Sequence, residues 1–551
     1  IIQLSEVNAT FLATKKSPIN HQNIHIDYIK SKSVGQEPSI LLSNTPSITY
    51  SVDGGHSQGY SYFRMRGLDQ TRINITIDGV PLNDPMDQAF YFSNFANLLG
   101  SIEMIQIQRG AGISKNGNAS YAGSIELFSK KLSDPQYFTF DIGYGSYNSF
   151  KTSAFFNSGI KNGKGLNLRV SKIYSDGYKN HSFNNSHSLS LSGGIFRDKS
   201  IWKLSVLAGK QKNGLAWMSV PENDINCCKT TNANSEFEED DFTQVQTKIN
   251  NTFLINKNSS VKSTFYYTFA DGWWNFDLDN YYGVDSDGTN LTKNEINSGM
   301  LGFFSNYEYL AKSLKFNFGI HGNTYKNNYI ESDANLNSIF YDVNRFKEEL
   351  STYTKVELNL GENFLFSSDI QFRKTSFDYE GDLMKFREIS WSFINPKIGL
   401  SYISQNNDVI YVSFASTGRE PAKYDMFQGN DILSYVPGAL DWDTYEYIGP
   451  EYGNQLISKN PEFVNDFEFG IRKRFENFNM NLNFFYMDFK NERVLNGQTG
   501  PSGLALRSRV DNSLRTGLEF FGELSILKNL KLTNNSSYNY SSVKQNDTEF
   551  T

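Results

Sequence analysis

The sequence predicts an all-β transmembrane barrel that encloses a small N-terminal α+β domain. The chain is polar, with a mean hydropathy of −0.49, yet 15% of its 551 residues are aromatic, among them 44 Phe and 32 Tyr. A large barrel reconciles these two properties, because aromatic side chains face lipid while polar ones face a wet lumen. The third observation is an alternation of apolar and polar residues that begins near Gln136.

Composition and motifs argue against several other classes of protein. The net charge of −7 gives no support for nucleic acid as a partner. No apolar run reaches the roughly 18 residues that a transmembrane helix needs. Because no nucleophile–base pair, phosphate-binding loop or zinc-ligand spacing stands out, we predict no enzyme, no catalytic residue, no metal site and no cofactor.

Residues 1–131 predict the α+β domain. Short apolar strands at 73–77 and 102–107 alternate with glycine-centred turns, and short helices are expected at His25–Lys32 and Gln36–Ser43. Such a mixed segment lacks the sustained period-two pattern of a barrel wall. We therefore predict that it sits in the lumen as a plug.

Residues 132–551 predict the barrel. Their alternating runs last about 9–11 residues, the length that a tilted strand needs to cross the hydrocarbon core, and we expect roughly 18 strands. Because a closed barrel leaves no unpaired edge in lipid, a last strand near Thr551 leads us to expect that further C-terminal strands are missing here. Examples of the alternation are Ser188–Ser192, Lys315–Phe318, Lys355–Leu360, Asp466–Phe469 and Met480–Phe484.

The connections between strands are of two kinds, as in outer-membrane barrels, which have short turns at one rim and long loops at the other. Short turn signals occur, for example, at 161–163, 361–363 and 405–407. Long polar loops are expected at 211–241, 271–296, 323–349, 377–395 and 417–463.

Three motifs in residues 1–131 resemble the plug of the TonB-dependent outer-membrane receptors. They are Phe63-Arg64-Met65-Arg66-Gly67, Asp78-Gly79-Val80-Pro81 and Gln108-Arg109-Gly110, and a final strand then has Ala122-Gly123 where the family usually has two glycines. Their common order and spacing make the resemblance specific. The motif residues that carry it are Arg64, Arg66, Gly67, Asp78, Gly79, Pro81, Arg109, Gly110 and Gly123.

The barrel adds a resemblance to iron-siderophore receptors of the Bacteroidota, in Phe393–Leu400, Ser413–Pro421 and Asn483–Asn491. The resemblance implies an outer-membrane location and a multi-pass barrel of about 22 strands around the plug. It also implies coupling to periplasmic TonB, with ExbB and ExbD.

We expect the motif residues to hold the plug together and not to contact cargo. Arg64, Arg66 and Arg109 are suited to bidentate pairing with barrel or plug carboxylates such as Asp78 or Glu103. The motif glycines allow tight turns or a close approach of the backbone.

The resemblance further implies a short extended segment before the plug, which adds a strand to the sheet of TonB. The candidate residues are Leu4, Ser5, Glu6, Val7, Asn8 and Ala9. The same residues would alternatively form a first plug strand, with the coupling segment upstream.

Cargo contacts are expected from two plug loops, residues 53–60 and 83–92. The second loop combines carboxylates, an amide and three successive aromatic residues, which suits stacking on a catechol, haem or sugar ring. The alternative is that the aromatic side chains of the second loop pack beneath it. The candidates are His56, Gln58, Tyr60, Asp84, Asp87, Gln88, Phe90, Tyr91 and Phe92.

Two further features lie in the predicted loops. Cys227 and Cys228 indicate an oxidised vicinal pair, with a soft metal such as copper as the alternative. Asp285–Asn290 resembles part of a calcium loop, but its glycine stands at the fourth position where the EF-hand pattern needs the sixth.

The leading functional prediction is TonB-dependent import of a scarce nutrient, a ferric siderophore. Haem is disfavoured, because no histidine lies between Pro421 and Asn460. One alternative is uptake of a glycan or peptide, with a surface lipoprotein as a lid. Another is a barrel that serves in adhesion or as the core of a multiprotein envelope complex.

Overall fold

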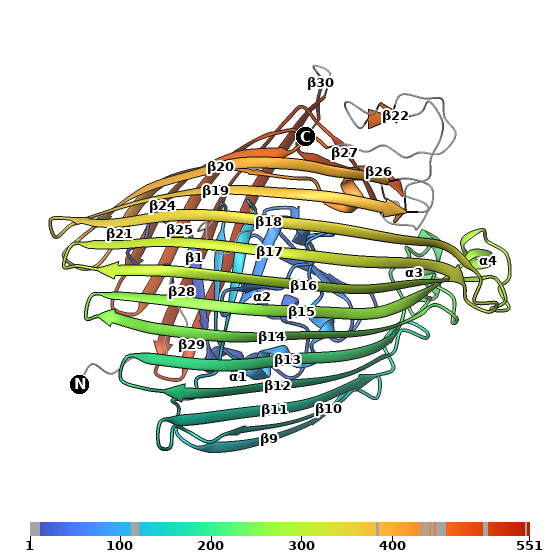
Figure 1. Ribbon diagram of the computed structural model, residues 1–551, viewed down its shortest axis with the longest axis horizontal. Helices are drawn as coiled ribbons and strands as arrows, with labels where there is room; N and C mark the ends of the chain where they lie inside the picture. Colours follow the sequence, from blue (N-terminus) through green and yellow to red (C-terminus); the bar gives the residue numbers. More distant parts are fainter. Residues whose placement is uncertain are drawn as a thin grey trace.

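The computed structural model describes residues 12–111, 121–381, 385–427, 429, 431–432, 440–441, 446–447, 459–499, 505–545 and 548–550. Long tilted strands form a barrel wall around a smaller N-terminal domain, the plug, which Figure 1 shows in blue inside the wall. The predicted fold class, a large β-barrel around an N-terminal plug, is confirmed.

The plug is built on a five-stranded sheet with the strand order β1-β7-β8-β5-β6. Strands β5 and β8 are parallel, and the other neighbours are antiparallel. The sheet strands are β1 (His21–His25), β5 (Ile73–Ile77), β6 (Val80–Pro81), β7 (Ile102–Arg109) and β8 (Gly123–Ser129). A second small sheet contains β2 (Ile48–Val52), β3 (Ser61–Met65) and β4 (Leu68–Asp69).

The two predicted helices are present as α1 (Ile26–Lys32) and α2 (Pro38–Leu42). Pro38 occupies the start of α2, where a missing backbone N–H costs nothing. Three short 3-10 helices, η1 (Gln70–Arg72), η2 (Phe92–Asn94) and η3 (Leu98–Ser101), connect the plug strands.

Two plug motifs form tight hairpin turns. Arg66 and Gly67 join β3 to β4 with φ of 54° and 77°, and Asp78 and Gly79 join β5 to β6 with φ of 51° and 90°. Positive φ at both central residues defines a type I′ turn, whose twist matches that of the flanking strands. Each motif therefore has glycine at the second turn position because the turn needs a positive φ there.

The barrel wall is antiparallel between sequential neighbours and closes between β30 and β9. The hairpins β22–β23 (Leu440–Asp441, Glu446–Tyr447) and β26–β27 (Arg493–Thr499, Ala505–Arg509) lie outside the wall sheet. The wall strands are β9 (Tyr137–Tyr144), β10 (Phe150–Asn157), β11 (Lys164–Ser175), β12 (Asn184–Phe196), β13 (Ser200–Gly214), β14 (Glu239–Asn256), β15 (Ser259–Asp277), β16 (Leu291–Leu310), β17 (Leu314–Asp333), β18 (Ile339–Leu360), β19 (Phe364–Gly381), β20 (Lys385–Ile403), β21 (Val409–Arg419), β24 (Glu462–Arg474), β25 (Phe478–Lys490), β28 (Asn512–Leu527), β29 (Leu530–Gln545) and β30 (Thr548–Phe550).

The strands are longer than the alternation predicts, and two predicted loops are wrong. In the loop expected at 377–395, residues 377–381 belong to β19 and residues 385–395 to β20. β18 has 22 residues, and most of the loop expected at 323–349 is a paired extension of β17 and β18. The reason is that only the part of a strand inside lipid needs an apolar outer face. Beyond the bilayer polar residues such as Lys326 and Asn328 occupy outward positions, and Tyr325 and Tyr329 face inward, so the period-two signal is lost while the hydrogen-bonded ladder continues.

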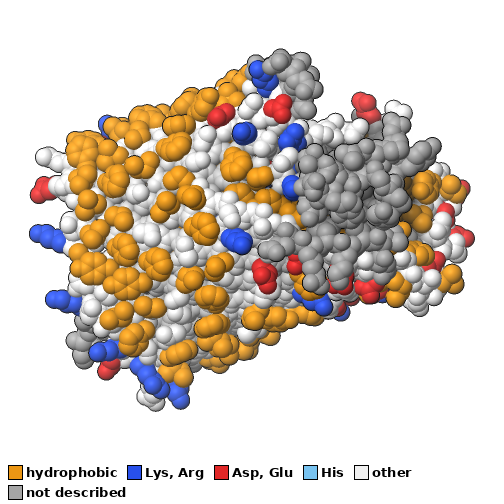
Figure 2. Space-filling model, turned by 45° about the horizontal axis from the view of Figure 1, so that its top comes forward, with side chains coloured by type: hydrophobic (Ala, Val, Ile, Leu, Met, Phe, Trp, Pro, Cys, Tyr) orange, Lys and Arg blue, Asp and Glu red, His pale blue; other side chains and the backbone are white. Residues whose placement is uncertain are grey.

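The outer surface of the wall is apolar and its inner surface polar. On β19 the outward Ile370 and Phe372 are exposed, whereas the inward Gln371 and Arg373 are each only 2% exposed. Figure 2 shows the hydrophobic side chains as a broad band over the wall, as expected for a transmembrane barrel. The rim that carries α3 (Glu222–Cys227) and α4 (Leu278–Tyr281) is at the right of Figure 1, and we assign it to the cell exterior.

Within the described ranges, no helix combines the length and the apolar character needed to cross a membrane.

Candidate functional site

Two plug arginines and two wall glutamates form a buried ionic cluster. Arg66 Nη2 lies 2.8 Å from Glu468 Oε1, and Arg66 Nε lies 3.0 Å from Glu519 Oε1. Arg109 Nε lies 3.2 Å from Glu519 Oε2. None of these four side chains is more than 5% exposed. Because Glu468 is on β24 and Glu519 on β28, the cluster fastens the plug to the wall.

Neutral groups complete the surroundings of both arginines. Asn20 accepts a hydrogen bond from Arg109 at 2.6 Å and donates one to Glu519 at 2.5 Å. The guanidinium carbon of Arg66 lies 3.9 Å from the centre of the Phe485 ring, a distance typical of a cation–π contact. Buried charges persist only with such partners, so this region of the plug and wall is fitted together closely.

Gly110 has two reasons to be glycine. Its φ is 80°, a conformation that other residues rarely adopt. A methyl group at this position would also collide with the carboxylates of Asp466 and Glu468. The next residue, Ala111, donates its N–H to Asp466 at 2.9 Å. The Arg-Gly motif therefore lets the plug backbone approach the wall carboxylates.

A second ionic cluster surrounds Arg72, which lies 3.1 Å from Glu462, 3.3 Å from Asp425 and 3.4 Å from Asp69. Arg507 lies 2.9 Å from Asp69. Asp425 belongs to the short helix α5 (Lys423–Met426). This cluster joins the plug to the wall and to α5 at once.

Asp78 anchors the plug at another part of the wall. Its carboxylate lies 2.8 Å from Lys248 Nζ on β14 and accepts hydrogen bonds from Ser129 N and Oγ at 2.9 and 2.7 Å. The Asp-Gly motif thus combines a tight turn with an ion pair to the barrel.

Arg66 and Arg109 do pair with barrel carboxylates, but the two acids named as examples from the sequence, Asp78 and Glu103, are not their partners. Asp78 pairs with Lys248 and Glu103 with Lys131. Arg64 is exposed, because alternation along β3 turns Phe63 and Met65 toward the plug core and Arg64 away from it. The wall acids could have been suspected, since 466–469 alternates acid and Phe as an inward-acid strand would.

Three half-buried tyrosines meet at the first candidate loop. The ring of Tyr91 makes edge-on contacts with those of Tyr60 and Tyr62, with centroids 5.5 and 6.1 Å apart. The Tyr60 hydroxyl donates to Asp240 on β14 at 2.5 Å, and the Tyr62 hydroxyl donates to Asp53 at 3.0 Å. We call these three side chains the tyrosine trio.

Electrostatics keep the tyrosine trio neutral. Burial, with nearby carboxylates, raises the pKa of Tyr60 and Tyr62 well above its usual value. Burial also raises the pKa of Asp53 to about 6, although its hydrogen bond from Tyr62 acts in the opposite direction. The hydroxyl groups are therefore hydrogen-bond donors at neutral pH.

The rest of the first loop lies against an extracellular connection. Tyr178 and Lys179, between β11 and β12, donate their backbone N–H groups to Gly54 O at 3.2 Å. His56 is half-buried and Gln58 is buried, and burial lowers the pKa of His56. This extracellular connection thus covers part of the predicted cargo loop.

The second candidate loop is held by charged contacts. Asp84 accepts a hydrogen bond from Tyr325 on β17, and Asp87 lies 3.3 Å from Lys423 of α5. The backbone N–H of Lys423 also donates to Met86 O at 2.9 Å. The polar candidates of this loop are therefore engaged with the barrel and α5.

Gln88 donates to Glu420 at 3.2 Å, and the cavity between this loop and the wall is only about 30 Å³, room for about one water. Phe90 and Phe92 are 2% and 1% exposed. Their rings pack in the plug core, so cargo would reach them only after the loop moves. Tyr91 is the candidate of this loop that belongs to the half-buried tyrosine trio.

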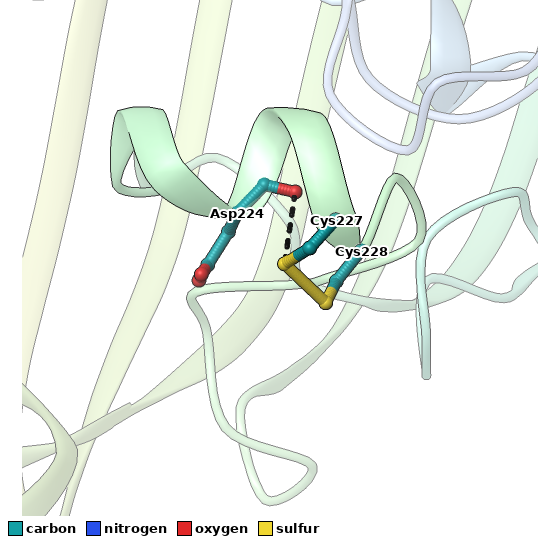
Figure 3. Close-up of a disulfide and its surroundings, with 3 residues drawn as sticks. All are labelled: Asp224, Cys227 and Cys228. Carbon is teal, nitrogen blue, oxygen red and sulfur yellow. Dashed lines mark hydrogen bonds between the residues drawn. A yellow bond between two sulfur atoms is a disulfide. The ribbon is translucent and has the colours of Figure 1, made fainter.

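Two other predicted features have simpler outcomes. The TonB-binding candidates Leu4–Ala9 lie outside the described residues. Cys227 and Cys228 form the expected vicinal disulfide at the end of α3, where Cys227 Sγ also contacts the carbonyl oxygen of Asp224 at 3.9 Å, as Figure 3 shows. Among the described residues, no group of His, Cys, Asp and Glu is arranged to hold a metal ion.

Comparison with known proteins agrees with this architecture. Residues 13–124 match the family model described as "TonB-dependent Receptor Plug Domain", and residues 228–551 match the one described as "TonB dependent receptor-like, beta-barrel". Members of this family are outer-membrane transporters that engage TonB and import small nutrients.

Solved structures with the same fold are distant in sequence. The siderophore receptor PiuA from Acinetobacter baumannii is 16% identical with a TM-score of 0.73, over 99% of this chain and 82% of that one. The unliganded ferric citrate transporter FecA is 13% identical with a TM-score of 0.76, over 96% and 79%. The copper transporter OprC is 12% identical with a TM-score of 0.74, over 96% and 80%. The matched models, the plug clusters and the closed wall together establish that this chain belongs to the TonB-dependent receptor family of outer-membrane transporters.

Proposed function

We propose that this receptor imports a ferric chelate of the siderophore type. The observation that carries the proposal is the tyrosine trio. Its half-buried rings and hydroxyl groups lie at a plug loop that contacts the extracellular connection at 178–179. Aromatic faces with a few placed polar groups are typical of small-ligand sites.

The chemistry of the trio suits an iron chelate. Phenol rings stack on catecholate or other planar groups, and neutral hydroxyls donate hydrogen bonds to the oxygen atoms that surround the metal. PiuA and FecA are described as a siderophore receptor and a ferric citrate transporter, and the Bacteroidota-like barrel segments support the same cargo class.

Release of the cargo requires the plug to move. Cargo at the trio would compete for the Tyr60–Asp240 and Tyr62–Asp53 hydrogen bonds, loosening the loop on its extracellular side. Traction by TonB from the periplasmic side then has to disrupt the ionic clusters of Arg66 and Arg72. Under this proposal, cargo binds at the extracellular end of the plug and TonB pulls at its periplasmic end.

Accumulation of ⁵⁵Fe tests the proposal in cells that lack their own receptors and express this chain. We expect energy-dependent uptake of at least one ferric siderophore, and weaker uptake with Tyr60→Ala or Tyr91→Ala. Tyr28→Ala is the matched control, because Tyr28 is an exposed plug tyrosine on α1, outside the trio. Absence of uptake across catecholate, hydroxamate and carboxylate chelates would contradict the iron proposal.

The alternatives give different results. A glycan or peptide receptor would support growth on its substrate whether or not iron is limiting, and would co-purify with a lipoprotein lid. An adhesion or structural barrel would transport none of these compounds. If the tyrosine variants take up iron normally, the proposal that the cargo is a ferric chelate still holds. The tyrosine trio would then not be part of the binding site.

A further inference from the structure

Three basic side chains stand next to one another on the outer face of the barrel. Lys172 on β11, His187 on β12 and Lys210 on β13 are all exposed. The strand register pairs Lys172 with His187 and His187 with Lys210. Directly paired side chains of an antiparallel sheet have Cβ atoms about 4.5–5.5 Å apart. We call this group the basic row.

Its neighbours do not neutralise the basic row. The register continues to Thr152 on one side and Thr243 on the other. The nearby carboxylate is that of Asp241, 3.3 Å from Lys210 Nζ, in a pair whose lysine is 59% exposed. An exposed pair of this kind contributes little, so Lys172 and Lys210 leave positive charge on either side of His187. An anion bound across the row would supply a counter-charge to both lysines.

The adjacent row of outward side chains, nearer the middle of the bilayer, is apolar and mostly small. Ala154, Val170, Leu189 and Ala208 occupy it in register, and Phe140 lies beside Ala154. Together with the basic row they line a concavity of about 530 Å³. Positive charge therefore borders a shallow groove that is apolar on its membrane side.

The position of the row matches a membrane boundary. Lys172 lies three residues before the end of β11 at Ser175, and His187 lies three residues after the start of β12 at Asn184. Both ends belong to the extracellular rim. Farther from that rim, the exposed outward residues of β11 are Val170, Leu168 and Leu166.

From this arrangement we propose that the basic row and its groove bind an anionic, phosphate-bearing lipid of the outer leaflet. Lys172 and Lys210 would contact the phosphate with His187 between them, and an acyl chain would fill the groove over Ala154 and Ala208. A lipid fits better than a soluble anion. The positive charges lie nearer the extracellular rim and the apolar groove nearer the middle of the bilayer, which is the order of the headgroup and the acyl chain in a lipid. The proposal is independent of the cargo.

Native mass spectrometry of the detergent-solubilised receptor, titrated with diphosphorylated lipid A, tests the proposal. We expect Lys172→Gln and Lys210→Gln each to weaken binding about fivefold, and the double variant about 25-fold, from the usual contribution of a basic residue at an anionic membrane surface. Lys374→Gln is the matched control, since Lys374 is also exposed on the outer face, paired with the exposed Leu350. Heat-modifiable migration on gels verifies that each variant is folded.

Two further measurements test whether binding depends on the negative charge of the lipid and whether free phosphate binds at the same site. Zwitterionic phosphatidylcholine should bind the wild type and the double variant equally. Inorganic phosphate should fail to displace lipid A at equal concentration. The proposal is overturned if the double variant binds lipid A like the wild type, if Lys374→Gln weakens binding as much, or if inorganic phosphate displaces the lipid.

Discussion

Glu519 is the wall residue at the centre of the Arg66 cluster. Its carboxylate accepts hydrogen bonds from Arg66, Arg109 and Asn20. A buried ion pair adds little net stability compared with apolar packing, because both charges lose their hydration. Removing one partner is different, since the other charge then stays buried without compensation. The cluster therefore specifies how the plug sits against the wall more than it stabilises the fold.

We expect Glu519→Ala to lower the free energy of plug unfolding by about 3–5 kcal/mol, the usual cost of breaking a buried pair. Urea denaturation of the receptor in detergent measures the change. Glu523→Ala is the matched control on the same strand, because Glu523 pairs with Lys531 at a partly exposed position, where a pair contributes about 1 kcal/mol or less. Equal losses in the two variants would show that the Arg66 cluster has no special role.

Glu37 makes plug stability depend on pH. Burial raises its pKa from 4.5 to about 8, so the folded plug favours the neutral acid. This contribution is fully present below about pH 4.5 and is lost as the pH rises through about 8. Glu37→Gln should therefore raise the melting temperature relative to wild type at pH 9 and leave it nearly unchanged at pH 4, as measured by calorimetry.

Asp27→Asn controls for the general loss of a carboxylate, because Asp27 is exposed in the first turn of α1. A Glu37→Gln effect that does not grow with pH would contradict a raised pKa for Glu37.

At the scale of elements, the turn at Gly110 tests why the Arg-Gly motif needs glycine. Gly110→Ala should destabilise the plug by more than the roughly 1–3 kcal/mol that an unfavourable backbone conformation costs, because the methyl group also meets two carboxylates. Gly67→Ala is the matched control, since Gly67 has a φ of 77° and a methyl group there would lie 3.9 Å from Arg515 Nη1, an ordinary van der Waals distance. Urea denaturation should give a larger loss for Gly110→Ala, and equal losses would rule out the steric contribution.

Much of the element level follows from the sequence. The helices α1 and α2, the strands β5 and β7 and the alternating wall strands appear where their patterns predict them. The extension of β17 and β18 through 323–349 does not, because its many polar residues interrupt the alternation and resemble a loop. Strand pairing there depends on the neighbouring ladder, which single-sequence periodicity does not report.

The candidate site was harder to predict than the fold. Local turn chemistry identifies Asp78-Gly79 and Arg66-Gly67, since both need positive φ within one motif. The partners of Arg66, in contrast, are 402 and 453 residues away at Glu468 and Glu519. Such pairing depends on the shear of the closed barrel, which fixes which inward position faces which plug side chain.

For the whole molecule, the plug is attached to separate parts of the wall. Lys248 on β14 holds Asp78, Glu468 and Glu519 on β24 and β28 hold Arg66, and Asp425 on α5 holds Arg72. Energy-coupled import through a barrel filled in this way requires displacement of the plug against its anchors. A plug tied covalently to the wall should therefore not transport.

The contact between Pro18 and Gly399 offers such a tie, because a Cβ at Gly399 on β20 would lie 2.8 Å from Pro18 Cβ. Disulfide bonds need a Cβ separation of about 3.5–4.5 Å, which a small backbone adjustment provides. The control is the wild type under the same reductant, since it retains Cys227–Cys228.

The most direct test is ⁵⁵Fe-siderophore uptake by cells that express Pro18→Cys/Gly399→Cys, with and without functional TonB, before and after reduction. We predict uptake only with TonB, its loss when the disulfide is formed and its return on reduction. Uptake that is equal without TonB, or that continues through the cross-linked receptor, would contradict TonB-driven displacement of the plug.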